Sequence, residues 1–143
     1  MKPVFVDTAG WMMLTDGADP EHAAACRFRD AWLKSGHTFV TTDYVTDETL
    51  TLIRMRLGVD AAEAWWDMVS ESQRVRTEPI DGSRAERARA WFFRWREQPF
   101  SFTDCTSFVL MRELKLSRAL TSDHHFTIAG FETAPSATRR RRR

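Results

Sequence analysis

The sequence has little cysteine and no long apolar run. Cys26 and Cys105 are its two cysteines, and neither belongs to a CxxC or Cys/His ligand spacing. A disulfide scaffold or a structural zinc site is therefore not expected. No apolar run approaches the roughly 18 residues that a membrane helix needs, and the apolar stretch 3–6 near the N-terminus ends at Asp7. We expect a cytoplasmic protein with no membrane partner.

The net charge is also small, at +1 over 143 residues, but basic and acidic residues are unevenly distributed along the chain. Five of the 21 basic residues form the terminal run 139–143, which leaves 16 basic against 20 acidic residues, a net charge of −4. An apolar content of 43% is enough to fill one core. The sequence predicts a single domain over residues 1–134 and a disordered, arginine-rich tail over 135–143, which either adds salt-sensitive affinity for RNA or is passive.

Short apolar runs alternate with longer amphipathic ones, a pattern typical of an α/β domain with a mainly parallel sheet. We expect strands at 4–6, 38–41, 74–79 and 119–121, and helices at 20–34, 43–57, 60–70, 83–95 and 103–115. Asp19 is predicted to cap the first helix, with Pro20 in its first turn, and Gly58 to end the second.

Two aspartates follow predicted strands directly: Asp7 comes after the strand 4–6, and Asp123 comes shortly after 119–121. Open parallel sheets bind ligands outside the carboxyl ends of their strands, so both acids are expected at that edge. Each alone is weak support for a site, because aspartate is common where strands end in turns.

Glu48 is distinguished by its place on the helix 43–57. At 100° per residue from Val45, Leu52 falls at about −20°, Met55 at about −80° and Glu48 at about −60°, while Asp47 falls at about 200°. The pattern therefore predicts Glu48 on a buried apolar face, where a charge needs a partner or a metal ion. A salt bridge to an arginine is the alternative explanation.

Asp104 repeats this pattern, because Phe108 and Met111 share its face of the helix 103–115. The segment is also an ordinary helix start, with Thr103 as the cap and an acid in the first turn. Both interpretations stay open on this motif alone.

Considered together, the four acids could converge on one edge of the sheet. Four carboxylates within about 5 Å of each other would repel by about 3 kcal/mol per pair at an effective dielectric constant of about 20. Such a cluster needs protons or divalent cations, and oxygen ligands favour Mg²⁺ or Mn²⁺. His124 and His125 are adjacent, so their side chains should point differently; we expect a loop or helix-start role for them rather than joint metal ligation. The chemistry indicated is phosphodiester hydrolysis by a metal-activated water.

Four stretches in this order, residues 4–8, 42–52, 101–105 and 120–126, resemble the motifs of the PIN-domain family. The resemblance covers residues 2–131, and within the family it is strongest to the small VapC-type ribonuclease toxins that are encoded with a VapB antitoxin. It implies a three-layer α/β/α sandwich, a metal-dependent endoribonuclease using Mg²⁺ or Mn²⁺, an RNA substrate, a cognate VapB-type antitoxin and a homodimer.

The resemblance also assigns roles to individual residues. Asp7, Glu48 and Asp104 match the three core acids, and Asp123 matches a fourth, more variable acid. Three threonines are expected to add supporting hydrogen bonds: Thr8, Thr103 and Thr121. One departure is Ala9, where many relatives have a small hydroxyl residue.

Three other interpretations bear on the same residues. An RNA-processing PIN nuclease without an antitoxin and a catalytically silent metal-binding module both stay open. A haloacid-dehalogenase-like phosphoryl-transfer domain is disfavoured, because it requires a second aspartate where Ala9 stands. The segment 84–96 interleaves arginines with aromatic residues, which suits either RNA binding or a core helix with a solvated basic face; the second interpretation places Trp91, Phe92 and Trp95 in the core.

Overall fold

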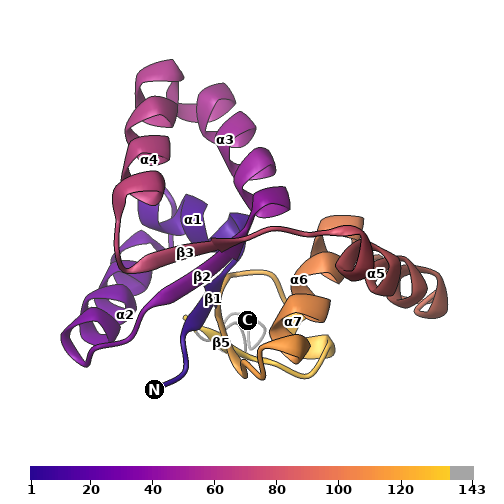
Figure 1. Ribbon diagram of the computed structural model, residues 1–143. Helices are drawn as coiled ribbons and strands as arrows, with labels where there is room; N and C mark the ends of the chain where they lie inside the picture. The colour runs from indigo at the N-terminus through magenta and orange to yellow at the C-terminus, as the bar shows by residue number, and fades with distance from the viewer. Residues whose placement is uncertain (136–143) are drawn as a thin grey trace.

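The computed structural model describes residues 1–135, and its centre is a five-stranded sheet (Figure 1). The strands are β1 (Val4–Val6), β2 (Phe39–Thr42), β3 (Val75–Glu78), β4 (Arg118–Leu120) and β5 (Glu132–Ala134). The helices are α1 (Thr8–Thr15), α2 (His22–Lys34), α3 (Asp43–Leu57), α4 (Val59–Glu71), α5 (Gly82–Arg94), α6 (Phe102–Glu113) and α7 (His125–Ile128). The predicted tail and the run 139–143 lie outside the described residues, apart from Pro135.

The strand order is β3-β2-β1-β4-β5, and every neighbouring pair is parallel. The chain moves outward from β1 to β3, then returns to place β4 on the other side of β1. With right-handed crossovers, α1–α4 cover one face and α5–α7 the other. In agreement, α3 packs on α1 and α4, while α6 packs on α5 and α7. The predicted α/β/α architecture is confirmed, and the point where the chain reverses direction lies between β1 and β4.

The core sits around β1, whose three residues are all buried. A strand that is covered by helices on both faces has a continuous apolar sequence, and this pattern predicts the strand Val4–Val6. On the α5–α7 side the rings of Phe5, Phe108 and Phe126 pack against one another. Among residues 1–135, no helix combines the length and apolar character that a membrane span requires.

Two elements were missed, α1 and β5, and α7 was anticipated only as one of two roles, a loop or a helix start, expected at His124 and His125. Helix α1 is short and mostly apolar, with four of its eight residues buried, so it lacks a polar face that would reveal a helical period. Strand β5 has three residues and begins with exposed Glu132, which gives no apolar run.

Two predicted helix caps were wrong. Helix α2 begins at His22, and the Asp19 carboxylate instead accepts a hydrogen bond from the Glu21 N–H at 2.8 Å, as in a turn. At α6 the cap is Ser101, not Thr103: the Ser101 hydroxyl accepts from the Asp104 N–H, and the Asp104 carboxylate accepts from the Ser101 N–H. This reciprocal pair fixes the backbone that carries Asp104.

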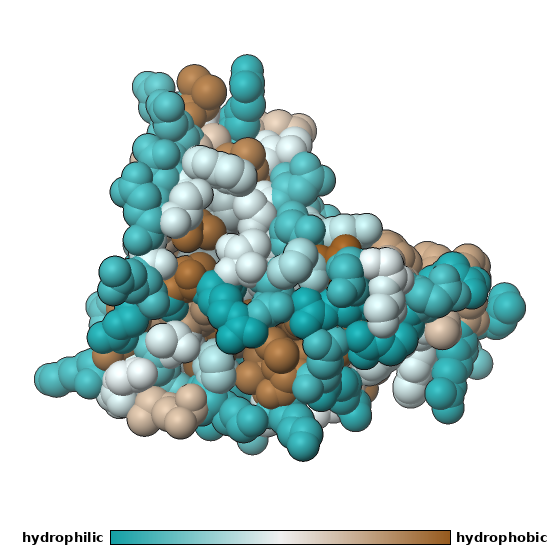
Figure 2. All heavy atoms as spheres, viewed as in Figure 1, coloured by the Kyte–Doolittle hydropathy of each residue, from teal (hydrophilic) through white to brown (hydrophobic). Residues whose placement is uncertain are grey.

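The aromatic residues of α5 are more exposed than a core helix allows. Trp91 packs partly on the core, whereas Phe92, Phe93 and Trp95 are 37%, 52% and 40% exposed. The prediction that Phe92 and Trp95 belong to the core was therefore wrong. Figure 2 shows one face of the molecule, where apolar side chains emerge in separate groups among hydrophilic ones.

Candidate functional site

A cavity of about 390 Å³ opens where β1 and β4 end, at the reversal point of the sheet. This is the edge at which open parallel sheets bind ligands. Its lining includes all four predicted acids and two of the predicted threonines: Asp7, Glu48, Asp104, Asp123, Thr8 and Thr103. Acids from one strand end, two helices and one loop therefore share a single cavity.

Asp7 is the most deeply placed of the four, at 6% exposure. One carboxylate oxygen accepts from the Gly10 N–H at 2.8 Å, and the other accepts from the Thr121 hydroxyl at 2.7 Å. Burial raises the pKa of Asp7 to about 8; the Thr121 and Gly10 hydrogen bonds oppose this rise, and the charges of Asp123 and Asp104 add to it. Without a nearby cation, Asp7 is therefore costly to ionise.

Gly10 allows the first turn of α1 to press against the end of β4. A Cβ at this position would lie 2.1 Å from the Leu120 carbonyl oxygen, so no larger residue fits without a backbone shift. The close approach helps bring Asp7, at the start of α1, into hydrogen-bonding range of Thr121.

Glu48, on α3, also lines the cavity. The prediction that it is buried was wrong, because Glu48 is exposed. Its Oε1 accepts from the Thr8 hydroxyl at 2.7 Å, and Thr8 in turn accepts from the Thr49 hydroxyl at 3.3 Å. Within residues 1–135 it pairs with no arginine, although Arg56 lines the same cavity.

The residue types of α3 explain why Glu48 is exposed although the periodicity predicts it to be buried. Its buried face is formed by Val45, Thr46, Thr49 and Ile53, whereas Met55 is 76% exposed. The two threonines count as polar in a periodicity argument, yet Thr46 satisfies its hydroxyl on the Thr42 carbonyl and is buried. The true buried face is rotated away from Glu48, which leaves this acid at the cavity edge.

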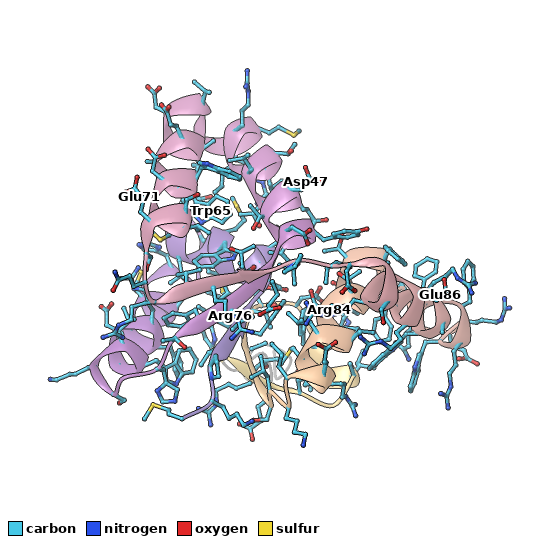
Figure 3. All side chains as sticks on the ribbon, viewed as in Figure 1. Asp47, Trp65, Glu71, Arg76, Arg84 and Glu86 are labelled. Atoms are coloured by element: carbon cyan, nitrogen blue, oxygen red, sulfur yellow. The ribbon has the colours of Figure 1, made fainter. Side chains whose placement is uncertain are left out.

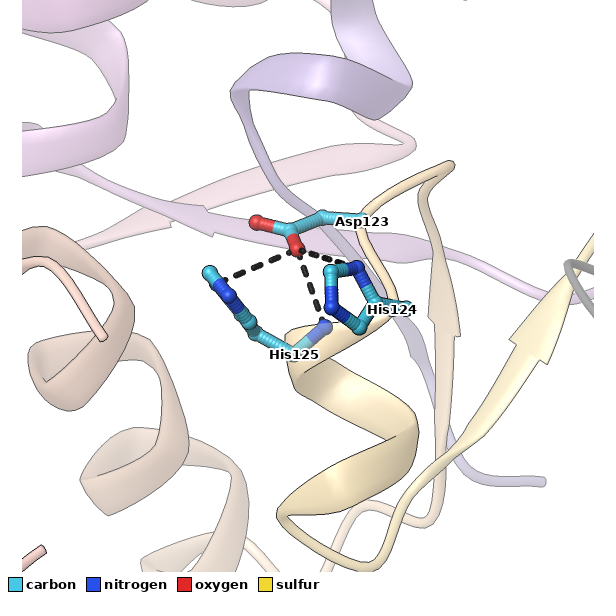
Figure 4. Close-up of side chains that lie close together, drawn as sticks. All are labelled: Asp123, His124 and His125. Atoms are coloured by element: carbon cyan, nitrogen blue, oxygen red, sulfur yellow. Dashed lines mark hydrogen bonds and ion pairs between the residues drawn. The ribbon is translucent and has the colours of Figure 1, made fainter. Parts of the chain in front are cut away.

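Asp104 and Asp123 meet around His125, which was not predicted to belong to the site. The His125 Nδ1 hydrogen-bonds Asp104 Oδ2 at 3.2 Å and lies 3.2 Å from Asp123 Oδ1. Figure 4 shows the Asp123 side of this arrangement, where the His125 backbone N–H also donates to Asp123 Oδ1 at 2.9 Å. Burial and the charge of Asp123 raise the pKa of Asp104, and the hydrogen bonds from Ser101 and His125 partly oppose this rise.

The two neighbouring histidines do not diverge as expected. Their ring centroids are 4.6 Å apart, and Asp123, His124 and His125 each offer a ligand atom within 4.8 Å of the others. The predicted helix-start role is confirmed, because α7 begins at His125. The sequence signal that could have found His125 is its spacing of two residues after an acid at a strand end, which suits a backbone N–H to carboxylate turn.

The supporting threonines differ in what they contact. Thr121 donates to Asp7 and accepts from the Asp123 N–H at 2.9 Å, so it links two of the acids. Thr8 contacts Glu48, while Thr103 lines the cavity beside Asp104. Asp19 also lines the cavity, although its local sequence suggested only a helix cap.

The donor set suits a hard divalent cation. Within residues 1–135, Asp104 Oδ1, Asp123 Oδ2 and Glu48 Oε2 have no hydrogen-bond partner, while the second oxygen of each carboxylate is anchored. Arg56 is the one basic residue among those that line this cavity. Carboxylates with free oxygens and almost no cationic neighbour are the ligands that Mg²⁺ and Mn²⁺ accept.

Comparison with known proteins agrees with this fold. A scan against protein-family models finds no match. The 23S rRNA-specific endonuclease VapC20 of Mycobacterium tuberculosis is 35% identical over 128 residues, which cover 90% of this chain and 95% of that protein. The crystal structure of VapC20, a toxin that cleaves the sarcin-ricin loop, matches with a TM-score of 0.82 at 34% identity, over 90% of this chain and 95% of that one.

A more distant structure shares the fold alone. VapBC2 from Rickettsia felis, solved with a DNA fragment from its promoter, matches at a TM-score of 0.69 and 9% identity, over 93% of this chain and 97% of that one. The parallel sheet and its helices match VapC PIN-domain structures, so the chain is a PIN-domain protein. Within that class, the chain belongs to the VapC toxin family.

Proposed function

We propose that this protein is a metal-dependent endoribonuclease toxin that cuts 23S rRNA. The observation that carries the proposal is the set of four carboxylates around one cavity. Support for the substrate comes from the 35% identity to an endonuclease specific for that RNA. An rRNA substrate would place its action in the cytoplasm.

In this proposal Asp7, Glu48, Asp104 and Asp123 hold one or more Mg²⁺ or Mn²⁺ ions. A bound ion would supply activation of a water molecule and neutralisation of charge on the oxygens of the scissile phosphate. No side chain is required as a covalent nucleophile.

The chain's own residues then have three tasks. Thr121 and the Gly10 N–H orient the Asp7 carboxylate, and Thr8 orients that of Glu48. Burial of Asp7 lowers the effective dielectric constant around its carboxylate, which strengthens electrostatic interactions there. Arg56 is positioned on the cavity wall to attract a phosphate.

Two neighbours on α3 provide the test. Glu48→Gln should reduce cleavage of an RNA that contains the sarcin-ricin loop by about a hundredfold or more, because it removes a ligand charge. Asp47→Asn is the matched control, since Asp47 is an exposed acid that does not line the acid cavity. Sequencing of the RNA ends would identify the cleavage position. Full activity of Glu48→Gln in the presence of EDTA would contradict the proposal.

We also propose a cognate VapB-type antitoxin and a homodimer. Trp66, Met68 and Phe93 are 47%, 44% and 52% exposed, which suits surfaces that bind a partner. The Rickettsia felis relative is a complex of this kind, as is the DNA-bound VapBC of Salmonella typhimurium. If a short reading frame beside the gene encodes a VapB-type protein, its co-expression should yield a complex that no longer cuts RNA. Light scattering of the free toxin should give twice the chain mass.

A further inference from the structure

His125 links two acids of the cavity that come from different parts of the chain. Asp104 lies in the first turn of α6, and Asp123 lies in the loop after β4. The Nδ1 atom of His125 stands 3.2 Å from an oxygen of each. The imidazole is therefore a direct bridge between these two carboxylates.

A metal site needs Asp104 and Asp123 in their ionised forms. An ionised carboxylate only accepts hydrogen bonds, so in that state Nδ1 of His125 donates to Asp104. A nitrogen that donates has no free lone pair for a metal ion. The free lone pair of a neutral imidazole is then on Nε2, so Nδ1, which contacts both carboxylates, acts on them and not as a metal ligand.

The oxygens that His125 contacts are also the ones anchored by the backbone. Asp104 Oδ2 additionally accepts from the Ser101 N–H at 3.1 Å, and Asp123 Oδ1 accepts from the His125 N–H at 2.9 Å. All these contacts gather on one oxygen of each acid. Within residues 1–135, the second oxygen of each is left without a hydrogen-bond partner.

The imidazole is itself held firmly. Its side chain is 16% exposed, and its ring packs edge-on against buried Phe100 at 5.4 Å between centroids. The next residue, Phe126, is fully buried. His125 is thus placed by the core and can impose a position on flexible carboxylates.

We propose that His125 is a positioning residue of the metal site, which holds one oxygen of Asp104 and one of Asp123 so that their other oxygens are available together for the cation. The proposal rests on the metal-dependent function proposed above. Residues that hydrogen-bond metal-ligating carboxylates commonly change metal affinity by about 10- to 100-fold when they are replaced.

The test measures Mn²⁺ affinity by electron paramagnetic resonance titration of the whole chain, well below the melting temperature of each variant. His125→Asn places an amide N–H near the position of Nδ1, whereas His125→Gln places it one bond further out. We expect His125→Ala and His125→Gln to weaken Mn²⁺ binding about tenfold and His125→Asn to restore most of it. His124→Ala is the matched control, because the His124 side chain is 57% exposed and its Nδ1 lies 4.0 Å from Asp123.

A merely structural role predicts a different result. His125→Ala would then lower the melting temperature but leave the Mn²⁺ affinity of the folded protein unchanged, and Asn and Gln would behave alike; either finding would overturn the proposal. Nitrogen coupling to bound Mn²⁺ that is lost in His125→Ala would also overturn it, since His125 would then be a ligand.

The outcomes separate this inference from the proposed function. If the wild-type protein binds no Mn²⁺, both the proposed metal site and the proposed role of His125 are contradicted. If Mn²⁺ binds with the expected variant pattern but no RNA is cut, the role of His125 stands while the proposed nuclease activity fails.

Discussion

Two clusters of charged residues in this chain differ in how their carboxylates are balanced. In the cavity, the charges of Asp104 and Asp123 act on Asp7, and the basic side chain in contact with Asp104 and Asp123 is His125. Between β3, α5 and α6, Glu78 and Glu113 each contact two arginines. We call the first group the acid cluster and the second the paired cluster.

The paired cluster is centred on Arg84, whose guanidinium contacts Glu78 at 2.9 Å and Glu113 at 2.6 Å. Figure 3 shows Arg84 on α5 and Arg76 on the neighbouring strand β3. Hydrogen bonds from Arg84 and Arg87 lower the pKa of Glu113 to about 2. The paired cluster therefore stabilises the fold at neutral pH, whereas the acid cluster, with the pKa of Asp7 raised to about 8, stores an unfavourable charge arrangement that a cation can relieve.

The largest expected effect comes from Asp7→Asn. It should reduce RNA cleavage by about a hundred- to a thousandfold, because it removes a proposed metal ligand. Stability should stay the same or rise, since the amide oxygen can still accept from Gly10 and no buried charge has to form. The cleavage rate checks the first expectation, and urea unfolding of the same preparation checks the second. A strongly destabilised Asp7→Asn protein would contradict the unfavourable charge assigned to this cluster.

The second prediction concerns pH and metal together. Asp7 has a folded pKa of about 8 against an ordinary value of 3.8, so the folded state prefers its protonated form. Its contribution to stability is fully present below about pH 4 and is lost as pH rises toward 8. Mn²⁺ should therefore raise the melting temperature more at pH 8 than at pH 5, as scanning calorimetry can show. Asp7→Asn should remove most of this difference, and an equal metal effect at both pH values would exclude Asp7 as its source.

Replacement of Arg84 should have a smaller effect, and on stability instead of activity. Arg84→Ala leaves Glu78 and Glu113 with one arginine each, which should cost about 2 to 3 kcal/mol of unfolding free energy. Arg84 does not line the cavity, so cleavage per folded molecule should change little. Arg89→Ala is the matched control, because its partner Glu86 is exposed and such pairs contribute little. Loss of cleavage in folded Arg84→Ala would mean that the two clusters are coupled through α6.

The sequence predicted four strands, five helices and four of the acids of the cavity because these depend on local signals. An apolar run ending at Asp7 and a helical period around Asp104 are visible without tertiary information. The burial of Glu48 was mispredicted because the buried face of α3 includes Thr46 and Thr49, whose hydroxyls donate hydrogen bonds to Thr42 and Thr8. The turn that joins the His125 N–H to Asp123 is local, but the contact of the His125 ring with Asp104 depends on the approach of α6 to the loop after β4, which no local pattern encodes.

The paired cluster could not be predicted from the sequence either, because it also depends on tertiary packing. Its arginines belong to a segment that suggested RNA binding or a solvated face, and only the packing of α5 against α6 brings Arg84 and Arg87 to Glu113. Charges spaced about 30 residues apart carry no periodic signal. By contrast, the acid cluster could be anticipated because its members follow strands or start helices at one edge of the sheet.

The smallest expected effect is the acid sensitivity of Glu113. Its folded pKa is about 2 against an ordinary value of 4.5, so its stabilising contribution is present above about pH 4.5 and is lost as pH falls toward 2. Because its side chain is 32% exposed, solvent weakens the pair, and Glu113→Gln should cost only about 1 kcal/mol at pH 7. Below about pH 2 the wild-type and variant proteins should unfold at the same urea concentration, since the wild-type side chain is then neutral too. A difference that persists at pH 2 would mean that Glu113 acts through packing, and that the two clusters differ less in charge balance than their geometry indicates.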